Sequence, residues 1–173
     1  MSEGADALRA RLAYRIRTVP PRDWGAFVSL WMAFNAMYGG EPDRKERARV
    51  MSLIRRLLSE TAARRVLRVS RPSIDRILEI PPGNLIMDRF NPRFRAASMK
   101  YAARYRDPQE TAVGRLAAVG AIVYQVRCNL MHGQKDPESV RDTMLVRESR
   151  KVLEALVGEL ESAATSLLQR AAS

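Results

Sequence analysis

The chain contains one cysteine, Cys128, and one histidine, His132, in 173 residues. A single cysteine cannot form an intrachain disulfide, and the two residues are too few for a tetrahedral zinc site of histidine and cysteine ligands. Zinc hydrolases are thereby excluded, and Cys–His–Asn proteases and Ser–His–Asp hydrolases remain only if His132 serves them. The sequence predicts no metal and no cofactor, and any acid–base chemistry near neutral pH converges on His132.

Long hydrophobic runs are also missing. No apolar run approaches the ~20 residues that span a bilayer, and residues 1–6 are polar and acidic where a signal peptide would be basic and then apolar. We therefore expect a cytoplasmic protein with no membrane partner. With 46% hydrophobic and 28% charged residues, the composition is that of a folded protein, and the length predicts one domain over residues 1–173.

Acidic residues are few: 19 Asp and Glu stand against 30 Lys and Arg, which gives a net charge of +11 and a pI of about 10.7. Residues 44–71 hold ten basic residues against two acidic ones, and residues 86–106 hold six against one. Such clusters attract polyanions because binding releases counterions, so RNA is the expected partner. The alternatives are an arginine content set by a GC-rich genome and, for the 100–104 segment, an ordinary solvated helix face. The candidate RNA contacts are Arg44, Lys45, Arg47, Arg55, Lys100, Tyr101, Arg104 and Lys135.

Prolines and glycines divide the chain into helix-length pieces with three- and four-residue apolar periodicity. This pattern predicts an all-α antiparallel helical bundle, with an irregular Pro-rich excursion at about 80–94. The predicted helices over 109–132 and 138–170 are expected to form an antiparallel hairpin, completed by those over 21–38 and 43–69. The predicted helices span residues 5–17, 21–38, 43–69, 73–79, 95–105, 109–132 and 138–170.

An aromatic stripe in the 21–38 helix, Trp31, Phe34 and Tyr38 at helical spacing, favours core packing over base stacking. Asn35 lies within that stripe, and we expect its amide to bind the 109–132 helix, since a polar group on an apolar face needs a partner.

Residues 124–135 combine an arginine, an amide and the sole histidine. Arg127 and His132 lie about 140° apart around an ideal helix, whereas Asn129 and His132 share a face at i,i+3 and Asn129 is expected to orient the imidazole. Gly133 fits the left-handed position that ends a helix, which places His132 in the last turn. An imidazole beside a guanidinium suits phosphodiester transfer. Alternatively, His132 binds the helix's last carbonyls and Arg127 is an ion-pair partner within the bundle.

The segment Val126 to Gly133 resembles the Arg-x4-His motif of HEPN ribonucleases, especially the ApeA-like group. The segment Trp31 to Gly39 resembles the Trp-x-x-Phe-Asn-x-x-Tyr helix of that group, and Arg141-Asp142 follows in the expected order. Many members have a polar residue directly after the motif arginine, where this chain has Cys128, which we expect to be a small buried hydrophobe.

This resemblance implies a four-helix core and a homodimer in which two motifs line one cleft. It implies metal-independent RNA cleavage to a 2′,3′-cyclic phosphate, with His132 as general acid–base, Arg127 stabilising phosphorane charge and Asn129 positioning His132 or the phosphate. The protein would be a toxin or antiphage effector, with an antitoxin or regulatory protein as a further partner. The alternatives are a non-catalytic HEPN module that binds RNA, a nucleotide or a protein, and a purely structural helical oligomer.

A homodimer is also expected because RNA transesterification benefits from an acid and a base, and each chain offers one imidazole. The small residues of the 109–132 helix allow close helix approach and are the candidate contact, unless they pack within one chain. They are Gly114, Ala117, Ala118, Gly120 and Ala121.

Overall fold

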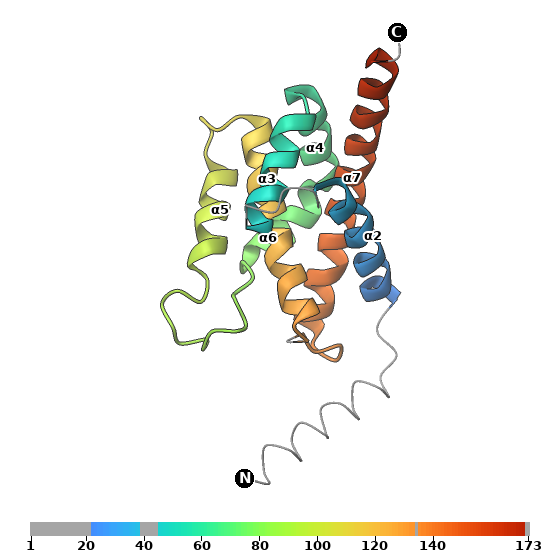
Figure 1. The fold of residues 1–173 in the computed structure, drawn as a ribbon. Coiled ribbons are helices and arrows are strands. Elements are labelled where there is room, and N and C mark those ends of the chain that lie inside the picture. The colour runs from blue at the N-terminus through green and yellow to red at the C-terminus, as the bar shows by residue number, and fades with distance from the viewer. Residues whose placement is uncertain (1–21, 39–44, 134, 172–173) are drawn as a thin grey trace.

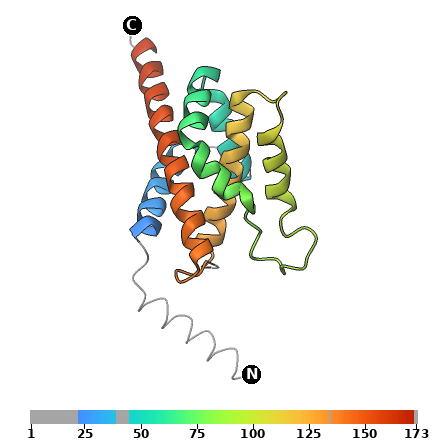
Figure 2. The same cartoon turned by 180° about the vertical axis from the view of Figure 1, so that it is seen from behind.

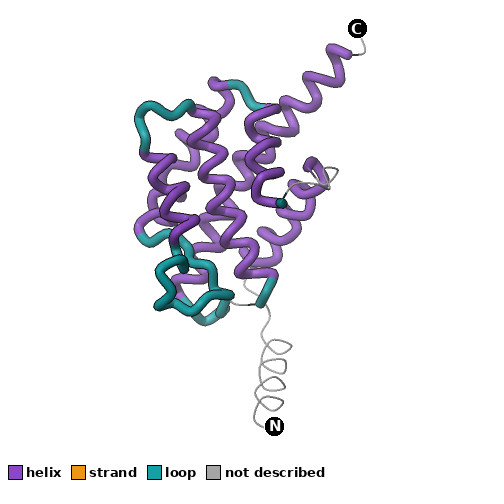
Figure 3. The backbone as a smooth tube through the Cα atoms, turned by 60° about the vertical axis from the view of Figure 1, so that its left-hand side comes forward, coloured by secondary structure: helices purple, strands orange, loops and turns teal. Residues whose placement is uncertain are grey.

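The computed structural model describes residues 22–38, 45–133 and 135–171, and over these residues the regular structure is helical throughout (Figures 1 and 3). The all-α prediction is confirmed. The helix expected over 5–17 and the candidate contact Arg44 lie outside the described residues. The helices are α2 (Arg22–Tyr38), α3 (Glu46–Leu57), α4 (Glu60–Glu79), α5 (Ala96–Arg106), α6 (Ala112–Met131) and α7 (Val140–Ala171).

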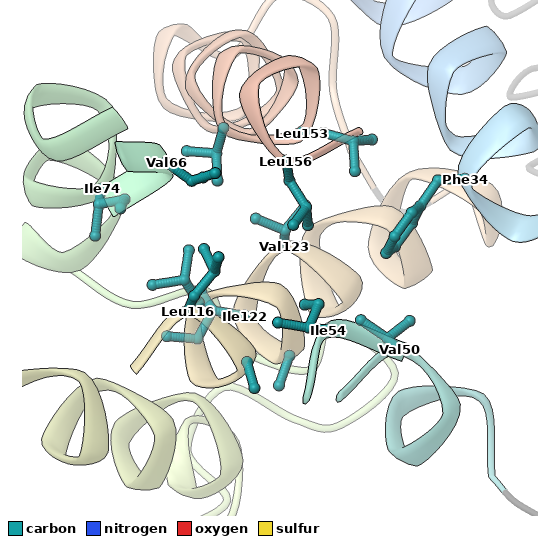
Figure 4. Close-up of a cluster of buried hydrophobic side chains, with 14 of the residues drawn as sticks. Phe34, Val50, Ile54, Val66, Ile74, Leu116, Ile122, Val123, Leu153 and Leu156 are labelled. Atoms are coloured by element: carbon teal, nitrogen blue, oxygen red, sulfur yellow. The ribbon is translucent and has the colours of Figure 1, made fainter. Parts of the chain in front are cut away.

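The helix α6 lies at the centre of the bundle and contacts α3, α4, α5 and α7. It runs antiparallel to α7, as expected of the hairpin, and α4 packs across both, which Figure 2 shows from behind. Apolar side chains from five helices meet around α6 in one core (Figure 4). Its labelled members are Phe34, Val50, Ile54, Val66, Ile74, Leu116, Ile122, Val123, Leu153 and Leu156.

Four helices agree with the prediction to within three residues at both ends, but the prediction for the 43–79 region is wrong. One helix was expected to end before Pro72, whereas the chain breaks at Leu58 and Ser59 and α4 runs through Pro72. Ser59 begins α4 because its Oγ accepts a hydrogen bond from the Ala62 amide at 3.2 Å. An interior proline costs a backbone hydrogen bond, but the buried face of α4 continues on both sides of Pro72, and packing holds the helix together.

The aromatic stripe of α2 is buried, as predicted. The Trp31 and Phe34 ring centroids lie 5.3 Å apart and those of Phe34 and Tyr38 5.2 Å apart, both nearly edge-to-face. The prediction for Asn35 is wrong: its side chain is exposed. Because Asn35 lies about 100° around the helix from Phe34, it leaves the buried stripe and faces solvent.

The small residues of α6 pack within the chain, so the prediction that they form the dimer contact is wrong. Ala117, Ala118 and Ala121 are at most 1% exposed. A Cβ atom on Gly120 would lie 2.7 Å from Ile54 Cδ1, so this glycine lets α3 approach α6 closely.

The connection from α4 to α5 is irregular over residues 80–94, as predicted, and projects at one end of the bundle (Figure 1). Among the described helices, none combines the length and apolar character needed to cross a membrane.

Candidate functional site

His132 follows the last residue of α6 and is exposed to solvent. The Gly133 amide donates to the Leu130 carbonyl at 3.0 Å, and Gly133 has a φ of 68°, which confirms the predicted left-handed helix end. The His132 imidazole makes no hydrogen bond or ion pair with any described residue. It is therefore available to a group outside the chain.

Arg127 is tied to α2 and α3 instead. Its Nη1 lies 3.1 Å from Glu46 Oε2, its guanidinium lies 5.8 Å from the centroid of the Trp31 ring, and its side chain is 22% exposed. The other Glu46 oxygen accepts a hydrogen bond from the Tyr38 hydroxyl at 2.9 Å. Burial and the Glu46 carboxylate raise the pKa of Tyr38 well above its ordinary value. This geometry matches the alternative in which Arg127 is an ion-pair partner within the bundle. No hydrogen bond or ion pair joins Arg127 to His132 in the described part of the chain.

The Asn129 amide holds a loop and makes no hydrogen bond to His132 within the described chain, contrary to its expected orienting role. Its Nδ2 donates to the Gly83 carbonyl at 2.8 Å, and its Oδ1 accepts from the Leu85 amide at 3.3 Å and from Gln125 Nε2 at 3.0 Å. Asn129 is 2% exposed. Both ends of the amide bind groups other than His132, so in this structure it does not position the imidazole.

Arg47, one of the predicted RNA contacts, is part-buried and extends this network. Its Nη2 donates to Gln125 Oε1 at 2.7 Å, and its guanidinium lies between the rings of Tyr101 and Tyr124, 5.9 and 5.2 Å from their centroids. The two aromatic faces and the amide hold the guanidinium against α5 and α6, although its Nε has no hydrogen-bond partner among the described residues.

Lys135 is buried, which contradicts its prediction as an RNA contact. Its side chain is 1% exposed and its Nζ lies 2.5 Å from Asp142 Oδ1. Burial lowers the pKa of Lys135, and the Asp142 carboxylate opposes that effect. Asp142 also accepts a hydrogen bond from the Asp136 amide at 3.0 Å, so Lys135 and Asp142 fix the turn between α6 and α7.

Four of the predicted RNA contacts converge, although they come from separate segments. Arg55 on α3 and Lys100, Tyr101 and Arg104 on α5 line one hollow with a volume of about 420 Å³. Arg55 and Lys100 are exposed, and Arg104 is paired with Glu110. Lys45, directly before α3, is exposed outside this hollow. The fold thus brings part of both basic clusters to one surface.

A larger basic hollow of about 950 Å³ was not predicted. It lies where α4 meets the α5–α6 connection, and its lining has five arginines and three acidic residues. The Glu60 carboxylate occupies the N-terminus of α6 by accepting from the Ala112 and Val113 amides at 2.9 and 3.2 Å. The spacing of three arginines on one face of α4 was a signal in the sequence. The arginines are Arg64, Arg68, Arg71, Arg106 and Arg115.

Within the described ranges, no group of three or more His, Cys, Asp or Glu side chains is arranged to hold a metal ion. The lone thiol, Cys128, was expected to be buried, but the structure shows it half-buried.

Comparisons with protein families, curated proteins and solved structures found no match. The HEPN resemblance therefore continues to rest on the residues of segments 31–39 and 126–133 and on Arg141-Asp142.

Proposed function

We propose that this protein is a metal-independent endoribonuclease of HEPN type in which His132 is the general acid–base. The observation that carries the proposal is the state of the sole imidazole. His132 is exposed at the end of α6, a largely buried helix, and its imidazole has no partner among the described residues. In this reaction the ribose 2′-oxygen attacks the adjacent phosphorus and the bond to the 5′-oxygen breaks. His132 accepts the 2′-hydroxyl proton or donates one to the 5′-oxygen, leaving a 2′,3′-cyclic phosphate and a 5′-hydroxyl.

Basic surface supports RNA as the substrate. Arg55, Lys100 and Arg104 face one hollow, and a charge of +11 over the chain favours polyanion binding. Tyr101 adds an aromatic ring to that hollow, although the ring also packs against the core.

Arg127 requires a change of partner to act on phosphate, because Glu46 now holds it. A second copy of the chain would supply the second imidazole that transesterification favours. Met32 and Met131 are 68% and 54% exposed and flank the small hollow that Arg127 and Asn35 line. We place the homodimer contact on this face, where it would bring the last turn of α6 to the partner.

A non-catalytic RNA-binding module is the second candidate, and the Arg127–Glu46 ion pair favours it. In that case the basic hollow binds RNA and the motif residues only stabilise the bundle. Under either function, a role as a toxin or antiphage effector and an antitoxin partner are proposals that follow from the family resemblance.

The deciding experiment incubates the pure protein with mixed RNAs in excess chelator and maps the ends of the fragments. We expect 2′,3′-cyclic phosphate and 5′-hydroxyl ends, abolished by His132→Ala and retained by Glu138→Ala, a control at another exposed residue of the same connection. Equal cutting by His132→Ala would show that His132 is not the catalytic group. If the wild type binds RNA but does not cleave it, the non-catalytic RNA-binding module is the remaining candidate.

The dimer is tested by light scattering and activity per chain over a dilution series. We expect Met32→Glu to give monomers with reduced activity per chain. A fully active monomer would rule out a composite site.

A further inference from the structure

The loop of residues 84–95 exposes apolar and basic side chains together. Phe90 is 88% exposed and Ile86 65%, values far above those of the core aromatics. Arg89, Arg93 and Arg95 are exposed on the same loop. Its one acidic side chain, Asp88, accepts a hydrogen bond from the Phe90 amide at 2.8 Å, which orients the tip.

The loop is a closed, internally bonded structure. The Asn84 amide donates to the Phe94 carbonyl at 2.7 Å and joins the two ends, and the Asn91 amide donates to the Asp88 carbonyl at 2.9 Å. A Cβ atom on Gly83 would lie 2.1 Å from the Phe94 ring, so this ring packs directly on the glycine. Phe94 is therefore the anchoring aromatic side chain of the loop. Phe90 is held facing solvent.

The neck of the loop is attached to the helix end that carries His132. Asn129 binds the Gly83 carbonyl and the Leu85 amide, and it lies three residues, about 4.5 Å along the axis, before His132. Arg141 at the start of α7 donates to the Ile80 carbonyl. Figure 3 shows the loop and the α6–α7 connection at the same end of the bundle.

We propose that the 84–95 loop binds single-stranded RNA, with Phe90 stacked on an unpaired base near the phosphate that reaches His132. The position of this base relative to the cut rests on the proposed function, but the binding does not. An exposed aromatic ring stacks on any base, and neighbouring guanidinium groups bind the adjoining phosphates. Because the loop has three arginines and one acidic residue, it favours RNA, which is a polyanion, over an apolar protein partner. The Asn129 anchor then ties the neck of this loop to the end of α6 that carries His132.

The test measures binding of short single-stranded RNA to the His132→Ala protein, so that no cleavage occurs. Stacking energies for one base predict that Phe90→Ala weakens binding by about 5- to 150-fold, whereas Phe90→Trp retains it. Val140→Ala is the matched control because Val140 is 87% exposed but lies on α7, outside the loop. The Phe90→Trp emission should be quenched by RNA and less by RNA with abasic sites. Trp24 and Trp31 are buried and give a constant background.

Unchanged affinity in Phe90→Ala would overturn the proposal, as would an absence of RNA binding. A Phe90→Trp emission that responds to anionic phospholipid vesicles and not to RNA would identify a membrane surface and overturn it too. The two proposals fail separately. Phe90-dependent binding without wild-type cleavage rejects only the enzyme, and cleavage with Phe90-independent binding rejects only the loop.

Discussion

Replacing Arg127 should cost stability as well as any activity, because its guanidinium is part of the bundle. The Arg127–Glu46 pair joins side chains that are only 22% and 18% exposed, at 3.1 Å. A charged hydrogen bond of this kind contributes about 1.5–3 kcal/mol, and removing one partner leaves the other charge largely buried. We therefore expect Arg127→Ala to lower the free energy of unfolding by roughly 2–3 kcal/mol, which lowers Tm by about 5–10 °C in a chain of this size.

The assay is a double-mutant cycle of Arg127→Ala and Glu46→Ala followed by thermal unfolding. Since the double variant leaves neither charge buried alone, it should be more stable than the sum of the single effects predicts, by about 1–2 kcal/mol. His132→Ala is the control and should change stability by less than about 0.5 kcal/mol, since its side chain is exposed. Additive effects, or an Arg127→Ala variant that melts like the wild type, would refute the structural role. If the double variant folds but does not cleave RNA, Arg127 acts in the reaction itself.

Three further outcomes follow from which polar groups the fold buries and which it leaves exposed. Asn129→Ala should lower the free energy of unfolding by about 2 kcal/mol, because the Gly83 carbonyl and Leu85 amide lose their partner, whereas Asn35→Ala, at an exposed position, should not. Equal melting of the two variants would contradict the anchoring role. Burial alone would raise the pKa of Glu148, but hydrogen bonds from Ser73, Lys151 and Arg147 hold it at about 2. Its ordinary value is 4.5, so the carboxylate contributes roughly 3 kcal/mol above pH 4.5, and this is lost as the pH falls towards 2. Unfolding measured from pH 5 to pH 2.5 should show less acid sensitivity in Glu148→Gln than in the wild type, and identical pH profiles would argue against it. Lys100→Ala should reduce the slope of log RNA affinity against log salt by about one, whereas Lys135→Ala should leave the slope unchanged and reduce stability. The reverse pattern would show that the exposed cation is not a phosphate contact.

Most of the fold could be predicted from local patterns. The spacing of Trp31, Phe34 and Tyr38 identified a buried helix face, and Gly133 identified the end of α6, because both signals depend on residues within one or two turns. The α3–α4 break was missed because Pro72 is the stronger local signal, and packing of the buried face of α4 outweighs it. For the candidate site, the sequence indicates that His132 is exposed, because His132 lies at a helix end.

The sequence by itself determined the helical class, the basic charge and the presence of one imidazole, since each is a property of composition or of short-range periodicity. Only the tertiary structure decided which charged and polar groups face solvent. Arg47 and Lys135 look like surface cations in the sequence, yet Arg47 is part-buried against Gln125 on α6 and Lys135 is buried against Asp142 on α7. Asn129 likewise binds Gly83, 46 residues away. Burying such a group costs free energy unless a partner meets it, and partners that lie far apart in the chain come together only when the helices pack.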